Sequence, residues 1–318
     1  MKRLVNIIIL IVVIPFISGW GFFAHKKINR LAVFTLPPEM IGFYKKNISY
    51  LTDKSVNPDM RRYIIKEEAA RHYIDLDQYG DSALHKLPRY WSDAVTQYTE
   101  DTLNAYGLVP WHINLVKYQL TQAFLNGDMD RMLRFSADLG HYIADANVPL
   151  HTTSNYNGQQ TGQVGIHGFW ESRLPELFFP DYDLLTGQAE YVDNTQLSVW
   201  EAVGKANMAL DSVFSMEKNL TQKFPESKKY SFEERGNTTI RVYSYEFSQE
   251  FHKQMNGMVE RQMRRAIKML GDFWYTAWVD GGQPDLDQWG EVQDGDDEVI
   301  EEAAEVKVRN HESGESMP

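Results

Sequence analysis

The sequence EFSQEFHKQMNGMVERQMRRAIKMLGDFWYTAWVDGG, residues 246–282, carries the clearest secondary-structure signal of the chain. Apolar residues recur at three- and four-residue spacing from Phe247 to Trp278, which is the period of one face of an α-helix. A Gly-Gly pair and Pro284 follow and end the pattern. The stretch therefore predicts one long amphipathic helix.

The same spacing recurs in three other segments, which are His25–Leu36, Leu115–Leu125 and Met129–Ala146. Signals for strands are few and short. Two segments rich in Gly, Ser, Asn and Gln, Leu76–Trp91 and Thr152–Ile166, are expected to be loops. We therefore expect an all-α fold, built as a single large helical domain.

The N-terminus has the pattern of an export signal over residues 1–19. Met1-Lys2-Arg3 is positively charged, residues 4–17 are almost wholly apolar, and Ser18-Gly19 are small. The apolar run of about 14 residues is shorter than the ~20 that span a bilayer, although an uncleaved membrane anchor is the alternative. We expect export to the periplasm or the cell exterior, with no stable membrane insertion after cleavage.

Charge separates the body of the chain from its C-terminus. The net charge is −12, and residues 285–318 alone carry twelve acidic and two basic residues. We therefore expect a folded domain over residues 20–284 and a disordered acidic tail over 285–318. The body gives no sign of an extended basic groove for nucleic acid. The chain has no cysteine, which excludes disulfides and thiolate metal sites.

Histidines and carboxylates are concentrated in one part of the chain. His141 and Asp145 stand four residues apart, as do His167 and Glu171, so each pair shares one face of a helix. His151 lies between the two pairs. A lone buried histidine is more often a hydrogen-bonded core residue, but this set within 31 residues favours metal binding, because imidazole and carboxylate both suit zinc.

Two earlier residues extend this set, and four histidines do not belong to it. His72 lies in RHYIDLD, and Asp59 precedes it in NPDMRR. The remaining histidines lack comparable partners in sequence and are interpreted as structural or solvated; they are His85, His112, His252 and His311.

The order of these motifs resembles that of the zinc-dependent phospholipases C and the three-zinc, single-strand-specific nucleases. The series begins with W-G-x-x-x-H at Trp20–His25, followed by an aspartate and then by H-Y-I-D at His72–Asp75. H-Y-I-A-D-A-N-V-P-L-H at His141–His151 and H-x-x-x-E at His167–Glu171 complete it. The resemblance covers residue 20 to about residue 171.

The resemblance implies three zinc sites. The first would be formed by Asp59, His72, His141 and Asp145. The second would be formed by His151, His167 and Glu171. The third would be formed by His25 and by the free amino group and carbonyl oxygen of Trp20 as the first residue of the mature protein, with Asp145 bridging to the first site. Asp53 is the alternative to Asp59, which we prefer because Pro58-Asp59 opens a helix-like segment leading to His72.

The expected chemistry follows from this arrangement. Zinc ions would make a hydroxide available near neutral pH to attack phosphorus, and would neutralise the phosphate oxygens. Asp59 and Asp145 are the carboxylates expected to act in catalysis. Asp75 either orients a ligand histidine or caps a helix end.

The substrate is less clearly indicated. Glu171 is more typical of the phospholipases, since the nucleases usually have aspartate there, and the segment between His151 and His167 lacks their paired-glycine and asparagine stretch. We therefore expect a phospholipase C-like phosphodiester hydrolase that binds a phospholipid headgroup, without a protein partner. The first alternative is a nuclease acting on single-stranded DNA or RNA, and the second is a non-catalytic zinc-binding protein. The sequence has neither the H-E-x-x-H helix of metalloproteases nor a G-x-S-x-G elbow.

Overall fold

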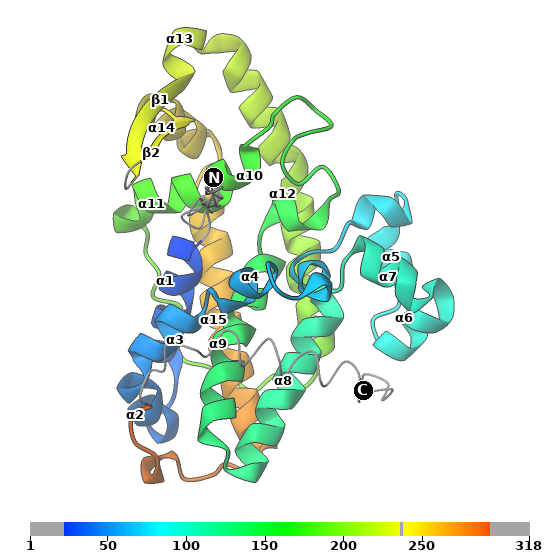
Figure 1. Cartoon of the computed structure of the whole chain (residues 1–318), viewed down its shortest axis with the longest axis vertical. Helices are drawn as coiled ribbons and strands as arrows, with labels where there is room; N and C mark the ends of the chain where they lie inside the picture. Colours follow the sequence, from blue (N-terminus) through cyan, green and yellow to red (C-terminus); the bar gives the residue numbers. More distant parts are fainter. Residues whose placement is uncertain (1–21, 236–237, 293–318) are drawn as a thin grey trace, which may run out of the picture.

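The computed structural model describes residues 22–235 and 238–292. This part of the chain is mainly helical (Figure 1), which confirms the expected class. It also contains one short antiparallel hairpin of β1 (Tyr230–Arg235) and β2 (Thr238–Tyr243), in which Tyr230 pairs with Tyr243. The predicted export signal, Trp20 and residues 293–318 lie outside the described residues.

The helices vary widely in length, from three residues in α10 to 29 in α12. The α-helices are α1 (Phe22–Ala32), α2 (Pro38–Lys46), α3 (Ile48–Lys54), α4 (Asn57–Arg61), α5 (Ala83–Lys86), α6 (Trp91–Tyr98), α7 (Glu100–Tyr106), α8 (Val109–Asn126), α9 (Met129–Ala146), α10 (Ile166–Gly168), α11 (Leu174–Phe178), α12 (Thr195–Lys223), α13 (Glu226–Lys229), α14 (Tyr245–Gln254) and α15 (Met258–Asp280). Four shorter 3₁₀ or π turns matter for the site or the C-terminus, and they are η2 (Lys66–His72), η4 (Pro149–Thr152), η5 (Phe169–Arg173) and η7 (Leu286–Gln288).

Helix α9 is the central element of the fold. It packs against α1, α3, α8 and α15 (Figure 1), and its residues from Phe135 to Ala146 are all buried. A helix that is surrounded on all sides is apolar on all sides unless its polar groups have partners inside the protein. His141 and Asp145 are therefore exceptions that must be explained by their surroundings.

A glycine allows α1 to approach α9 closely. A Cβ atom at Gly140 would lie 2.3 Å from Oδ1 of Asn29, so any side chain there would displace the buried amide of Asn29 on α1. Asn29 lies one helical turn after His25, and its side chain donates to the carbonyl oxygen of His25. The close approach consequently brings His25 beside His141.

The prediction of one helix from Phe247 to Trp278 is wrong, because the chain forms α14 and α15 with a break between them. Asn256 and Gly257 have φ of 47° and 74° and leave the right-handed helical region. Asn and Gly are the residues that most readily adopt this left-handed conformation. The predicted end of the helix is confirmed, since α15 stops at Asp280 immediately before Gly281.

The other segment predictions were largely confirmed. Helices α8 and α9 cover two of the segments with helical spacing, and α9 has the predicted bounds. The segment His25–Leu36 is helical in α1 only to Ala32 and continues as a 3₁₀ turn from Val33 to Thr35. The predicted loop at residues 152–166 is irregular after η4. The predicted loop at residues 76–91 is wrong in part, because it contains a 3₁₀ turn and α5.

The predicted start of the disordered tail at Asp285 is too early. Leu286 in η7 is buried, and the ring of Trp289 lies 6.4 Å from that of Phe43 on α2. The amide of Asn47 donates to the carbonyl oxygen of Gly290, and its Oδ1 accepts from the backbone N–H of Val292. The apolar side chains of this acidic segment thus hold it against α2 as far as residue 292. Within the described residues, no helix combines the length and the apolar character needed to cross a bilayer.

Candidate metal centre

Eight of the nine residues predicted as metal ligands lie together, and the ninth, Trp20, is outside the described residues. They form three groups of potential ligands in which the donor atoms of each group lie within 4.8 Å of one another. The groups are His25, His141 and Asp145; Asp59, His72 and His141; and His151, His167 and Glu171. These buried clusters of imidazole and carboxylate could hold metal ions.

The first predicted site is assembled from α4, η2 and α9. Nε2 of His141 lies 3.0 Å from Nδ1 of His72, and Oδ2 of Asp145 lies 2.9 Å from the same His72 atom. Asp59 is slightly further away, with its Oδ1 3.8 Å from His72 and 3.9 Å from His141. Asp53, the alternative in the sequence, instead pairs with Lys26 at 2.8 Å on the surface. The geometry therefore favours Asp59.

Backbone carbonyl groups fix the orientation of two histidines. Nδ1 of His141 donates to the carbonyl oxygen of Ser55 at 2.8 Å, and Nδ1 of His151 donates to that of His72 at 2.6 Å. Because a carbonyl oxygen can only accept, each Nδ1 carries the hydrogen. The lone pair of each neutral ring is then on Nε2, which points toward the other potential ligands, as a metal-binding histidine requires.

The second predicted site lies where η4 faces α10 and η5. Nε2 of His151 lies 3.0 Å from Nε2 of His167, and Oε2 of Glu171 lies 2.6 Å from His167 and 3.4 Å from His151. The His167–Glu171 pair lies at the junction of an α-turn with the π-helical turn η5. Single π turns inside helices are frequent at functional sites.

His25 joins the two sites. Its Nε2 lies 3.5 Å from Oδ1 of Asp145 and 3.1 Å from Oε1 of Glu171, and its ring stacks on that of His141 with centroids 4.1 Å apart. The sequence predicted that Asp145 reaches the His25 site, and the distances agree. The contact between His25 and Glu171 was not predicted.

The donor atoms of each group lie close enough together to bind one cation. Two ligands of a tetrahedral zinc ion at about 2.0–2.1 Å are about 3.3 Å apart. Nε2 of His141 lies 3.3 Å from Oδ2 of Asp145 and 3.0 Å from Nδ1 of His72. Oδ2 of Asp145 and Oε2 of Glu171 lie closer to their histidines, at hydrogen-bonding distances of 2.9 Å and 2.6 Å. Zinc prefers imidazole nitrogen and carboxylate oxygen when thiolate is absent. Moreover, buried carboxylates without a compensating cation are costly. Both observations indicate that the centre accommodates a cation.

The ionisation of the metal-free centre leads to the same conclusion. Burial alone would lower the pKa of His141, but the charges of Asp145 and Asp59 outweigh burial and raise the pKa to about 9. Burial likewise opposes the charge of His151, but Asp145 and Glu171 raise its pKa to about 9. Protons therefore occupy the centre at neutral pH when no metal is present, and a metal ion would displace them.

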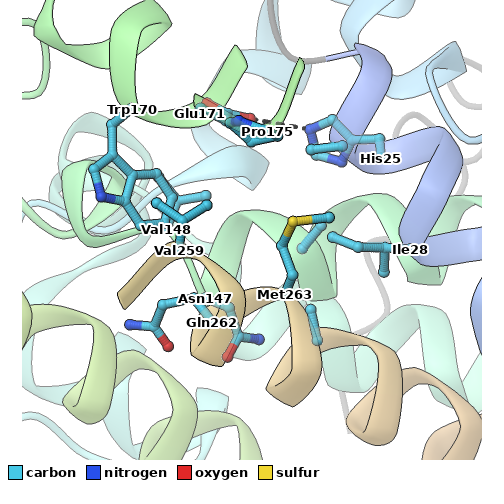
Figure 2. Close-up of a pocket in the computed structure, with 13 residues that line it drawn as sticks. His25, Ile28, Asn147, Val148, Trp170, Glu171, Pro175, Val259, Gln262 and Met263 are labelled. Atoms are coloured by element: carbon cyan, nitrogen blue, oxygen red, sulfur yellow. Dashed lines mark hydrogen bonds and ion pairs between the residues drawn. The ribbon is translucent and has the colours of Figure 1, made fainter. Parts of the chain in front are cut away.

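One small cavity lies behind the centre. Figure 2 shows His25 and Glu171 at its edge, with Ile28, Trp170 and Met263 around it. Its volume of about 20 Å³ is enough for roughly one water molecule and its walls are almost entirely apolar. His167 and Asp59 are partly exposed, so solvent reaches the centre at these two side chains.

The remaining histidines are placed as predicted where the structure describes them. His112 is buried with its ring 4.5 Å from that of Tyr142, His85 is exposed, and His252 stacks on Phe178. His311 lies outside the described residues.

The orienting role considered for Asp75 is not observed. Among the described residues its side chain forms no hydrogen bond to a predicted ligand, and it does not cap the 3₁₀ turn η3 (Leu76–Tyr79) that follows it. Burial and the charge of Asp77 raise its pKa to about 7.

Two charged residues beside the centre were missed. Glu68 lies one turn before His72, a Glu-x-x-x-His spacing that matches the predicted pairs in reverse order. Arg62 donates to Oδ1 of Asp59 at 3.3 Å and is half exposed. In the sequence, Arg62 could have been identified by its place three residues after the predicted ligand Asp59.

The chain matches no protein-family model, and no curated protein matches it at a significant level.

Proposed function

We propose that this protein is an exported, zinc-dependent phosphodiester hydrolase of the phospholipase C type. One observation carries the proposal: the two oxygens of the buried Asp145 face different histidines, with Oδ2 2.9 Å from His72 and 3.3 Å from His141 and Oδ1 3.5 Å from His25. Such sharing brings two cation sites close enough to act on one substrate. In this proposal the first ion is held by four residues, which are Asp59, His72, His141 and Asp145. The second is held by His151, His167 and Glu171, and the third by His25 and Trp20 with Asp145 as the bridge.

Zinc ions bound there would activate a water molecule and neutralise the charge of a phosphate diester. The residues of the chain fix the geometry of this reaction. Asp59 is the more exposed carboxylate of its group, at 20% against 2% for Asp145. It is therefore the carboxylate that can accept a proton from the solvent side, while Asp145 serves as the buried bridge.

Arg62 is suited to bind the substrate phosphate. Its guanidinium group is half exposed and already lies beside Asp59 at the open side of the centre. Guanidinium groups bind phosphate oxygens with paired hydrogen bonds. Arg62 would therefore hold a non-bridging oxygen as the diester enters.

Apolar side chains near the centre favour a phospholipid over a nucleic acid. Tyr63 and Ile64 follow Arg62 directly and are 79% and 44% exposed, and Tyr156, whose ring lies 5.7 Å from that of His167, is 51% exposed. Aliphatic and aromatic side chains together suit the boundary of a bilayer, whereas single-stranded nucleic acid requires a series of cationic groups along its backbone.

A side-by-side assay tests the proposal. The zinc-loaded protein beginning at Trp20 would be incubated with phosphatidylcholine vesicles and, separately, with single-stranded DNA and RNA. Release of phosphocholine without nucleotide release is the expected result. Nucleotide release would instead identify a nuclease, and zinc binding without turnover of either substrate would identify a non-catalytic zinc-binding protein.

A further inference from the structure

A buried group of charged residues lies directly behind His72. Glu68 is fully buried, and its Oε2 accepts from Arg71 at 2.6 Å while its Oε1 accepts from the hydroxyl of Tyr142. Arg61 lies 3.6 Å from the same Oε1 and donates to Asp138 at 2.8 Å. We call these five residues the buried ion cluster.

The buried ion cluster connects the segments that supply the first predicted metal site. Arg61 belongs to α4 with Asp59, and Glu68 belongs to η2 with His72. Tyr142 of the cluster belongs to α9 and directly follows the predicted ligand His141. The cluster therefore fixes α4, η2 and α9 relative to one another at the point where their ligands meet.

The two ring nitrogens of His72 face different groups. Nδ1 faces the metal site, 2.9 Å from Asp145. Nε2 is buried without a hydrogen-bond partner among the described residues, and Oε1 of Glu68 lies 3.9 Å from it. When Nδ1 binds a metal ion, Nε2 of the neutral ring must carry the hydrogen. Among the described residues, Oε1 of Glu68 is the carboxylate oxygen within 4.0 Å of this Nε2, and at 3.9 Å the ring or the carboxylate must move for the hydrogen bond to form.

We propose that Glu68 is the positioning residue of His72, and that the buried ion cluster sets the affinity of the first metal site. A ligand histidine usually donates its second N–H to a carboxylate or carbonyl group, which fixes the ring and makes the ligand nitrogen more basic. In His141 and His151 the second N–H is donated to a backbone carbonyl oxygen. For His72, Glu68 is the acceptor group near the second ring nitrogen. The inference rests on the metal binding of the proposed function.

The charges of the buried ion cluster support this role. Its two arginines are balanced by the two carboxylates of Glu68 and Asp138, so the cluster adds no net charge beside the metal site. Loss of the Glu68 charge would leave an unbalanced buried cation beside His72, which disfavours a metal ion there. A buried ion pair is in itself a poor source of stability, because apolar residues of similar volume often do as well. A positioning role explains its presence better than stability does.

The test compares zinc binding by the wild type with that of Glu68→Gln, using competition with a chromophoric chelator and metal analysis. We expect one zinc ion per chain to bind about 10- to 100-fold more weakly, and the others to bind as in the wild type. The matched control is Asp272→Asn, which removes a partly buried carboxylate that accepts from Lys268 at 2.6 Å on α15. All its zinc affinities should be unchanged.

A milder variant covers the case in which Glu68→Gln does not fold. Tyr142→Phe removes only the hydroxyl that donates to Glu68. It should weaken the binding of the same zinc ion by several-fold. Wild-type zinc affinities in Glu68→Gln, or in Tyr142→Phe if the first variant is unfolded, would overturn the inference alone. A wild-type protein that binds no zinc would overturn the proposed function, and the inference with it.

Discussion

Oδ2 of Asp145 lies 2.9 Å from Nδ1 of His72, while Oδ1 of the same carboxylate faces other histidines. Oδ1 lies 3.5 Å from His25 and 3.8 Å from His151. One side chain on the most buried helix thus lies within 4 Å of a member of every group of potential ligands. Its charge should matter more than that of any other single carboxylate in the centre.

Asp145→Asn should therefore abolish turnover. The amide keeps the shape of the side chain but loses the charge and one acceptor, so the bridge between two cation sites is lost. Even outer partners of metal ligands change affinity or activity by about 10- to 100-fold, and we expect a loss of more than about 100-fold here. Steady-state rates on the substrate identified above would measure it.

The matched control is Asp53→Asn, since Asp53 is the alternative to Asp59 in the sequence but lies on the surface in the structure. It is exposed and pairs with Lys26, so its rate should stay within about twofold of wild type, as expected for an exposed ion pair. Retention of more than a few per cent of the rate in Asp145→Asn would contradict the bridging role.

The metal-free protein should lose stability as the pH rises above neutral. The pKa values of His141 and His151 are raised to about 9 by neighbouring carboxylates, against about 6.5 in the unfolded chain. Protonated histidines therefore stabilise the fold fully below about pH 6.5, and this contribution is lost as the pH rises through about 9. Thermal unfolding in chelator should show Tm falling across this window.

Zinc should reverse this trend. Its ligands must be deprotonated, so zinc binds more tightly as the pH rises over the same range. At a free zinc concentration 100 times Kd, each site adds about 2.7 kcal/mol to the free energy of unfolding. Melting curves with and without zinc should therefore diverge between about pH 6.5 and pH 9. Parallel curves, or a Tm unaffected by chelator at pH 8, would contradict a metal centre at these histidines.

Local spacing predicted the parts of the centre that lie within one element. His141 and Asp145 share a face of α9 because four residues make about one turn. The same spacing brings His167 to Glu171, although the turn between them is partly π-helical. The aspartate before His72 could also be chosen, since Pro58 opens a short helix at Asp59.

Contacts between distant elements could not be predicted from spacing. His25 on α1 meets Glu171 on η5 although 146 residues separate them, and no pattern in either segment indicates that contact. Glu68 was missed because glutamate is usually exposed, and only the two arginines beside it make its burial tolerable. The break between α14 and α15 was missed because the apolar period continues through Asn256-Gly257.

An extension before Trp20 should remove one zinc ion from the protein. The resemblance to the three-zinc enzymes assigns the free amino group and carbonyl oxygen of Trp20 to the site of His25, and any added residue converts that amine into an amide. Metal analysis should show one zinc ion fewer per chain than in the protein beginning at Trp20, with the same extension at the C-terminus as the control. Equal zinc content in all three proteins would rule out Trp20 as a ligand.

Substitution of the exposed apolar residues beside Arg62 should separate bilayer binding from catalysis. Tyr63 and Ile64 are 79% and 44% exposed, and we expect them to enter the boundary of a bilayer when the phosphate reaches the centre. In Tyr63→Ser/Ile64→Ser the lost apolar contact is about 2 kcal/mol, which corresponds to a roughly 30-fold weaker affinity for phosphatidylcholine vesicles. Co-sedimentation and the rate on vesicles would both fall, while the rate on a monomeric short-chain phosphatidylcholine would not. Leu185→Ser is the control. This leucine is about as exposed as Tyr63, at 83%, but it belongs to a different segment, which is bound to Arg264 on α15. Its substitution should therefore leave vesicle binding unchanged. An equal loss on vesicles and on the monomeric lipid would mean that Tyr63 and Ile64 act in the chemistry or the folding of the centre and not at a membrane surface.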